Sequence, residues 1–298
     1  MSMSMTGRQK ILIAAICLTP VIIGIALVAG SSAERSSPLS FRKVGLVQIS
    51  DVILSSDAVI KQLRSFREDA SIAGVLLRID SPGGASAPSQ EIFSEVMRYR
   101  AIRKPVVVSV GNMAASGGYY IASASTRIFA NQSSITGSIG AIVEFPQYYK
   151  LLDKIGVSLN VIKAGTFKDM GSPQRQMSKE DRALMQGIVD DIHEQFIRDV
   201  CTARSMPIAS IRPIADGRIM TGAQALKVGL VDTLGTYEDA LSYLKSSLGI
   251  PAKTPVVEKK RRESFLRNII FGELAERFPF LKNSYAPAGS YFLFQAGL

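Results

Sequence analysis

Apolar and polar residues alternate in blocks along the chain between residues 44 and 130. Short apolar runs predict buried strands at residues 44–49, 74–79, 106–110 and 127–130. Apolar side chains at helical spacing predict helices at residues 56–68 and 88–100. A strand, a helix and a second strand in this order indicate parallel strands joined by right-handed crossovers, so we predict an α/β fold.

Beyond residue 130 the pattern is less regular. We predict strands at residues 139–145 and 158–162, with a helix at residues 147–155 between them. Ser178 and Asp181 have the spacing of a helix N-cap with an acidic first turn, which predicts a long helix to about residue 204. Two further helix starts have the same kind of cap, at Thr221 with Gln224 and at Thr236 with Asp239.

The N-terminal region contains one long uncharged stretch. Residues 11–30 are apolar or small apart from Thr19, and about twenty such residues span a bilayer as a helix. Arg8 and Lys10 before it favour an N-terminus inside the cell. The stretch is longer than the core of a cleavable signal peptide, although the small residues at 29–33 resemble a cleavage site. We expect an uncut anchor in the cell (inner) membrane at residues 1–33, a linker at 34–43, and a body at 44–250 on the extracytoplasmic side.

Residues 251–298 are expected to form a basic, amphipathic tail. A linker-like stretch and the basic residues 259–262 precede an apolar stripe at four-residue spacing, made of Leu266, Ile270, Leu274 and Phe278. Two interpretations stay open. The predicted helix either packs on the body or lies on the membrane, with the basic residues at lipid headgroups.

Composition narrows the class of protein. The formal net charge is +10, but no nucleic-acid-binding motif accompanies it, so membrane lipids are the better partner for this charge. No phosphate-binding lysine loop and no metal-ligand spacing occur, so we predict neither a cofactor nor a metal. Cys17 lies in the apolar stretch and Cys201 late in a predicted helix, so we expect no disulfide between them.

Ser116 is the candidate nucleophile. It lies among the small residues 114–118, after one predicted strand and before a predicted helix at 119–124. A serine at such a turn exposes its hydroxyl, which still needs a base. The only histidine, His193, lies far downstream on a predicted polar helix face, so we expect a lysine base rather than a Ser-His-Asp triad. Residue order alone leaves several lysines open, namely Lys150, Lys154, Lys163, Lys168 and Lys179.

The pair Gly83 and Gly84 is a candidate oxyanion loop. It follows a predicted strand and precedes a predicted helix, and glycine lets backbone amides approach a substrate closely. The alternative is an ordinary Pro-Gly turn. Asp80, just before this loop, is interpreted as a turn cap.

These motifs together resemble the signal peptide peptidase A family, membrane-bound peptidases with a Ser-Lys dyad. The resemblance runs from about residue 44 to residue 249. It is carried by segments 78–84, 111–120, 136–140, 167–173 and 221–232 in that order. It implies a fold like the Clp protease subunit and the crotonases. Ser116 would be the nucleophile and Lys168 the general base. Gly83 and Gly117 would be oxyanion donors, and Ser138 would orient the lysine unless it only forms a glycine-flanked turn.

The resemblance also implies a function. Apolar peptides, above all remnant signal peptides, would be the substrates of a serine endopeptidase, and a single-copy chain would form a homo-oligomer, an octameric ring. Because Ser116 and Lys168 lie on separate segments, we expect neighbouring subunits to share the dyad. Asp169 would raise the pKa of Lys168 if it faced that side chain, so we expect it to point away. Two alternatives remain, a crotonase-like acyl-CoA enzyme and a catalytically silent membrane scaffold.

Overall fold

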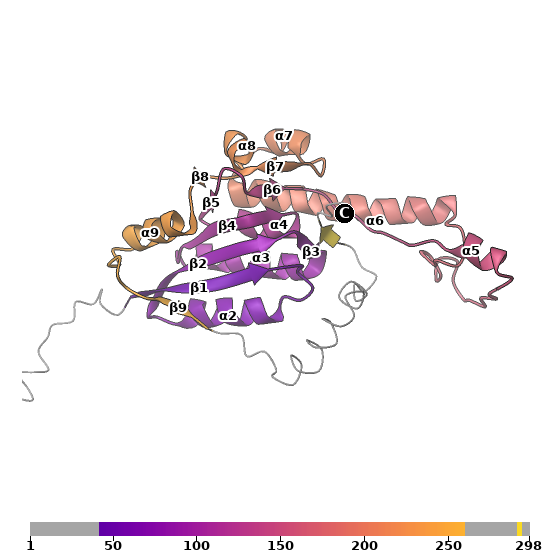
Figure 1. Ribbon diagram of the computed structural model, residues 1–298, viewed down its shortest axis with the longest axis horizontal. Helices are drawn as coiled ribbons and strands as arrows, with labels where there is room; N and C mark the ends of the chain where they lie inside the picture. The colour runs from indigo at the N-terminus through magenta and orange to yellow at the C-terminus, as the bar shows by residue number, and fades with distance from the viewer. Residues whose placement is uncertain (1–41, 260–290, 294–298) are drawn as a thin grey trace, which may run out of the picture. The chain divides into compact units, whose positions relative to one another are not determined.

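The computed structural model describes residues 42–259 and 291–293. Its centre is a mostly parallel sheet in the strand order β7-β6-β4-β2-β1-β9, with β5 pairing β4 and β8 (Figure 1). The predicted apolar runs form its parallel strands, β1 (Lys43–Ser50), β2 (Ile72–Ser81), β4 (Val106–Ala115) and β5 (Arg127–Ala130). The α/β class is therefore confirmed.

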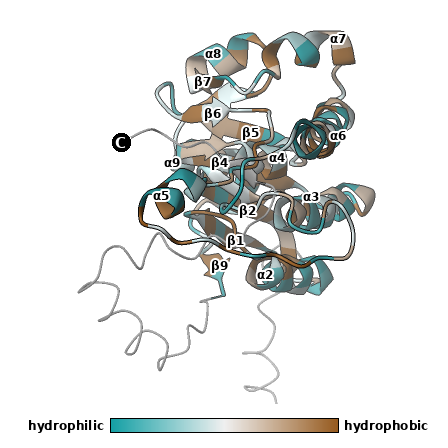
Figure 2. Ribbon diagram, turned by 90° about the vertical axis from the view of Figure 1, so that its right-hand side faces the viewer, coloured by the Kyte–Doolittle hydropathy of each residue, from teal (hydrophilic) through white to brown (hydrophobic). Residues whose placement is uncertain are grey.

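Helices cover both faces of this sheet. The predicted helices α2 (Asp57–Glu68) and α3 (Ser86–Ala101) pack on one face, where Leu63, Phe66 and Tyr99 are buried with the strands. On the other face α9 (Tyr237–Ser247) buries Leu241 and Leu244. Figure 2 shows hydrophobic positions on the strands and hydrophilic ones on the outer helix turns. Burial on both faces is why these strands are continuous apolar runs.

Strand β4 changes its neighbour halfway along. Residues 107–109 pair with β5, whereas residues 113–115 pair with β6 (Ile135–Gly137). Strand β7 (Ile219–Thr221) extends the sheet beyond β6 in the antiparallel sense. The short helix α4 (Gly117–Ser123) begins directly after β4, as predicted for a strand-to-helix turn.

The capping motifs predicted from the sequence are present. Ser178 and Asp181 form a capping box at the start of α6 (Lys179–Arg204). Thr221 caps α8 (Gly222–Lys227), and Thr236 caps α9, each with its predicted partner. Between α6 and β7 lie α7 (Ile208–Ile211) and the 3-10 helix η2 (Arg212–Ile214), and β8 (Thr233–Leu234) precedes α9.

Residues 141–192, called the arm below, depart from the predictions at two segments. Helix α5 (Tyr149–Lys154) is present, but the predicted strands at 139–145 and 158–162 are wrong: both segments are irregular apart from one bridge residue, Ile142. Among the described residues no sheet edge pairs with them. Figure 1 shows α5 beyond the N-terminal half of α6, away from the sheet.

Two short strands complete the described chain. Strand β9 (Val256–Glu258) pairs in parallel with β1, within the stretch predicted to be a linker. Strand β10 (Tyr291–Leu293) pairs antiparallel with β3 (Gly83–Ala85), the segment predicted to be the oxyanion loop. The predicted transmembrane segment at 11–30 and the apolar stripe at 266–278 lie outside the described residues. Within residues 42–259 and 291–293, no helix has the length and apolarity needed to cross a membrane.

Candidate active site

Ser116 occupies a strained turn between β4 and α4. Its backbone has φ 52° and ψ −118°, a conformation that costs a non-glycine residue about 1–3 kcal/mol and persists only where the surroundings impose it. Two hydrogen bonds impose it here: the Ser116 amide donates to the Gly137 carbonyl at 2.8 Å, and the Tyr120 amide donates to the Ser116 carbonyl at 2.8 Å. The residue is 1% exposed. Within the described residues its hydroxyl makes no hydrogen bond.

The candidate oxyanion loop packs directly against the start of α4. A Cβ added to Gly117 would lie 3.3 Å from the Gly84 nitrogen and 3.4 Å from the Gly83 Cα. Gly84 itself has φ +157°, and a Cβ on it would lie 2.1 Å from the Ile53 carbonyl oxygen. Only glycine fits between Ile53 and α4, and this close approach brings the loop to Ser116.

Ser81 braces the loop and was missed by sequence reasoning. The Gly83 amide donates to the Ser81 hydroxyl oxygen at 3.1 Å, and that hydroxyl donates to the Asp51 carbonyl at 2.5 Å. The Gly83 amide thus has a partner within the chain, whereas the Gly84 nitrogen is the one near Gly117. The Gly84 amide is therefore an additional candidate oxyanion donor, and its place in the Gly83-Gly84 pair was the sequence signal for it.

Ser138 belongs to the same site. It follows Gly137, whose carbonyl holds Ser116, and it is buried with φ 53°. Its amide donates to the Arg218 carbonyl at 2.8 Å. The structure therefore brings together the segments of Ser116, Gly83, Gly117 and Ser138, although they are spread over 56 positions of the sequence.

Lys168 lies in the arm and is not brought to Ser116 by any described contact. Its side chain is exposed, and within the described residues its ammonium group makes no hydrogen bond or ion pair. Asp169 points to other partners, as expected: its carboxylate binds Lys163 at 2.5 Å and Arg175 at 2.9 Å. The base of the predicted dyad is therefore presented on a separate part of the chain.

His193 and Asp80 are candidate site residues from the sequence, and neither is hydrogen-bonded to Ser116 in the described chain. His193 is half-buried on α6, and its Nε2 atom has no hydrogen-bond partner, so no contact links it to Ser116 in the described chain. The Asp80 carboxylate accepts from the Met113 amide at 3.2 Å, across the irregularity in the β2–β4 pairing. Asp80 thus satisfies backbone beside the site, in keeping with a cap.

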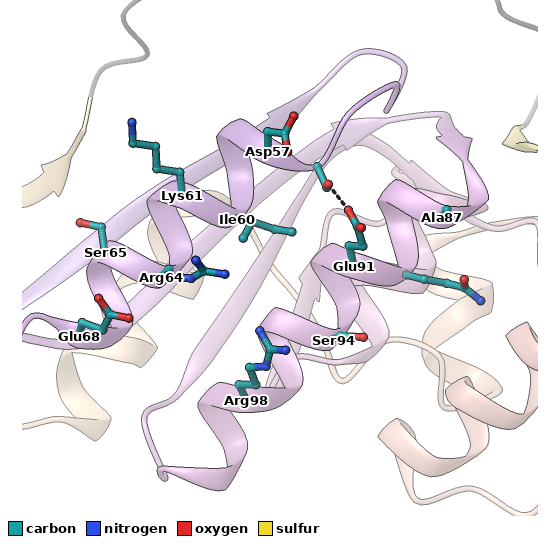
Figure 3. Close-up of a pocket in the computed structure, with 12 residues that line it drawn as sticks. Asp57, Ile60, Lys61, Arg64, Ser65, Glu68, Ala87, Glu91, Ser94 and Arg98 are labelled. Atoms are coloured by element: carbon teal, nitrogen blue, oxygen red, sulfur yellow. Dashed lines mark hydrogen bonds between the residues drawn. The ribbon is translucent and has the colours of Figure 1, made fainter.

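The larger of two described hollows is not at this site. It measures about 940 Å³ and lies between α2 and α3 (Figure 3). Its charged lining residues are three cations, Lys61, Arg64 and Arg98, and three acids, Asp57, Glu68 and Glu91. In Figure 3 Arg64 and Arg98 point into the gap, whereas Lys61 points away from it. This balance gives no net attraction for an ion. A second hollow, about 620 Å³, has residues 51–55 in its lining, of which Ile53 pairs with β3.

Comparisons with known proteins define the class. The model of peptidase family S49 matches residues 98–250, which include Ser116, Ser138 and Lys168. A Synechocystis protein named "Putative protease slr0021" is 41% identical over 211 residues, 70% of this chain and 76% of that protein. The "Putative signal peptide peptidase SppA" of Enterococcus faecium is 38% identical over 217 residues, 73% of this chain and 63% of that protein.

A plant relative covers more of the chain. The "Serine protease SPPA, chloroplastic" of Arabidopsis thaliana is 31% identical over 253 residues, 84% of this chain but only 36% of that protein. The α/β fold and these matches define a peptidase. The chain belongs to peptidase family S49, as an SppA-like member.

The strain at Ser116 leads to a stability prediction. Ser116→Gly should unfold at a higher temperature than Ser116→Ala, because both lack the hydroxyl but only glycine adopts a positive φ without strain. The difference should be about 1 kcal/mol, or ~3 °C in melting temperature, when both variants of the soluble body are heated under the same conditions. Equal melting temperatures would show that the turn is unstrained.

Proposed function

We propose that this S49 peptidase is a membrane-anchored serine endopeptidase that cleaves apolar peptides, including remnant signal peptides, with Ser116 and Lys168 as its dyad. The observation that carries the proposal is the buried, strained turn at Ser116, packed against a glycine loop in a chain of a peptidase family. A strained serine between a strand and a helix is a recurring way of presenting a nucleophile. The family match also favours this function over an acyl-CoA enzyme.

In the proposed chemistry Ser116 is the nucleophile and Lys168 carries the proton. The neutral amine of Lys168 takes the proton of the Ser116 hydroxyl as its oxygen attacks the peptide carbonyl. Lys168 then gives that proton to the leaving amine, and water hydrolyses the acyl-enzyme by the same route. Amides of the glycine loop and Gly117 bind the oxyanion. Gly83 offers its amide only if the contact to Ser81 is exchanged, whereas Gly84 is nearer to Gly117.

Strand β3 is the proposed binding edge for the substrate backbone. In the described chain this edge accepts an extended segment, because β10 pairs antiparallel with it at Gly83, Gly84 and Ala85. A peptide added as a strand at the same edge would pass beside the turn of Ser116. Main-chain pairing of this kind gives affinity with little demand on sequence, which suits a peptidase for varied apolar peptides.

Lys168 is proposed to serve the Ser116 of a neighbouring subunit. The arm that carries it exposes large apolar side chains that a solvated segment does not favour, including Leu151, Ile155, Leu159 and Ile162. Helix α5 buries none of its residues, and the first half of α6 exposes Leu184 and Ile188. A second copy of the chain would cover this surface, complete the dyad, and surround Lys168 with apolar groups that lower its pKa. In a closed ring, which the family resemblance suggests is octameric, the arm of each subunit would be covered by its neighbour.

Labelling of the nucleophile tests the dyad directly. A serine-reactive fluorophosphonate should modify Ser116, and peptide mapping should find the label in residues 111–120. Ser116→Ala should lose labelling and hydrolysis while remaining folded, and Lys168→Ala should be nearly as inactive because the two groups act as one unit. His193→Ala is the control and should keep both activities. Full hydrolysis by pure Ser116→Ala protein, or a silent but folded wild type, would rule the proposal out.

Complementation tests the shared dyad. Ser116→Ala and Lys168→Ala chains, each inactive, should regain part of the activity when they are unfolded together and reassembled, because some interfaces then pair an intact serine with an intact lysine. Each variant reassembled alone is the control. The measurement is peptide hydrolysis together with the mass of the assembly by light scattering. Mixed assemblies without activity would place each dyad within one chain.

Shortening the C-terminus tests the substrate edge. A chain that ends at residue 290 lacks β10, so β3 is left unpaired and a peptide no longer competes with the chain's own strand. The KM for an apolar peptide should fall, with kcat little changed, in steady-state assays against the full chain. A matched chain that ends at residue 293 retains β10 and should resemble the full chain. Equal KM values for the two shortened chains would show that substrates do not use this edge.

A further inference from the structure

Asp169 directly follows the proposed base, Lys168, and its carboxylate is paired with two other cations. Asp169 lies in a cluster with Lys163, Arg175 and Asp181, called the Asp169 cluster below. Lys163 Nζ lies 2.5 Å from Asp169 Oδ1 and also donates to the Thr166 carbonyl at 2.9 Å. Arg175 binds the same carboxylate with two nitrogens, Nε to Oδ2 and Nη2 to Oδ1, each at 2.9 Å.

The cluster also fastens the loop of Lys168 to α6. Arg175 Nη1 lies 2.5 Å from Asp181 Oδ2, and Asp181 is 2% exposed. Asp181 is the third residue of α6 and closes the capping box with Ser178, so its position is set by the helix. Arg175 thereby connects the carboxylate beside Lys168 to a rigid element.

The charges of the cluster cancel. Two cations face two carboxylates, and the bonds from Arg175 and then Lys163 hold the pKa of Asp169 well below its usual range. The charged groups come from three segments: Lys163 before the loop, Arg175 after it, and Asp181 on α6. Helix α5 contributes no ion pair to it within the described residues, nor do Lys179 and Glu180 of α6.

This arrangement matters because of what a free carboxylate would do. An opposite charge within about 4–6 Å of a titrating group favours its charged form and shifts its pKa by about 1–3 units. An unpaired Asp169 beside Lys168 would stabilise the ammonium, raise the lysine pKa, and leave less neutral amine to act as a base at a given pH. Cations that hold Asp169 prevent this.

We propose that Lys163 and Arg175 are positioning residues that sequester the Asp169 carboxylate, so that Lys168 has no acidic partner and works as a base at lower pH. The proposal rests on the proposed function of Lys168. In this proposal Asp169 does not contact the substrate. Asp169 connects the Lys168 loop to α6 through Arg175, and the two cations cancel its charge.

The test follows the rate of fluorophosphonate labelling of Ser116 against pH in the assembled full-length protein. This single step should speed up as pH rises through the Lys168 pKa, and its midpoint reports that pKa. Arg175→Met leaves the Asp169 cluster with a net negative charge, so the midpoint should move up by about 1 pH unit. Asp169→Asn leaves a net positive charge and should move it down, and the double variant should return it toward the wild-type value.

Two variants separate charge from structure. Arg175→Lys keeps the positive charge but loses the two-pronged contact, so its midpoint should stay near that of the wild type even if its maximal rate falls. Lys163→Met removes one cation with less disturbance of the loop and should shift the midpoint up, which keeps the test open if Arg175→Met does not fold. Arg212→Met is the matched control, because Arg212 also grips a carboxylate, Glu194, with two nitrogens, outside the arm.

The outcomes are distinct. Opposite shifts for Arg175→Met and Asp169→Asn, with the control unmoved, support the proposal. A lower rate at every pH with an unchanged midpoint would mean that Arg175 only holds the loop, and the proposal would be wrong while the dyad stands. If Lys168→Ala labels at the wild-type rate, the base is elsewhere, and the proposed function fails together with this inference.

Discussion

The hydrogen bond from the Ser116 amide to the Gly137 carbonyl is the contact on which the site depends. At 2.8 Å it joins the end of β4 to the end of β6, just where β4 has left its other neighbour, β5. Together with the bond from the Tyr120 amide to the Ser116 carbonyl, it holds the positive φ that turns the chain from β4 into α4, where Gly117 lies against the β3 loop. Ser138 follows directly from the acceptor residue. One backbone contact thus helps to set the relative positions of Ser116, the glycine loop and Ser138.

The body of the fold could be predicted because its signals are local or fully buried. The strands at residues 44–49 and 106–110 are apolar runs that pack on both sides within the chain, so burial within the chain explains their composition. The cap at Ser178 is a hydrogen-bond pattern closed within four residues. Strand β6 was missed because its three residues, Ile135–Gly137, are too few for a pattern and owe their conformation to pairing with distant β4.

The irregular segments of the arm could not be predicted from the same signals. Residues 158–162 have the apolar character of a strand, yet within the described chain they have no sheet edge and remain exposed. An apolar pattern indicates that a segment is buried by something, but it does not identify the strand, helix or second chain that buries it. The candidate site divides in the same way. Four of its five predicted residues meet in one chain through backbone contacts, whereas Lys168 sits on the segment whose surface is incomplete. Ser81 was missed, and Gly84 was not singled out from its pair as a donor, because their roles depend on contacts with residues 51–53.

Helix α6 connects the part of the chain around Ser116 to the arm that carries Lys168, and this has a mechanical consequence. Its 26 residues make a rod of about 39 Å, anchored at one end by Phe196, Ile197 and Val200 and joined near the other, through Asp181 and Arg175, to the loop of the proposed base, Lys168. A pivot of about 5° at the anchor would move the far end by about 2 Å, and a misplacement of about 1 Å can cost a hundredfold in rate. The anchor packs on the nucleophile's own helix, since the ring of Phe196 meets that of Tyr120 edge-on at 4.8 Å. The position of the loop that carries Lys168 thus depends in part on a buried aromatic contact four residues from Ser116.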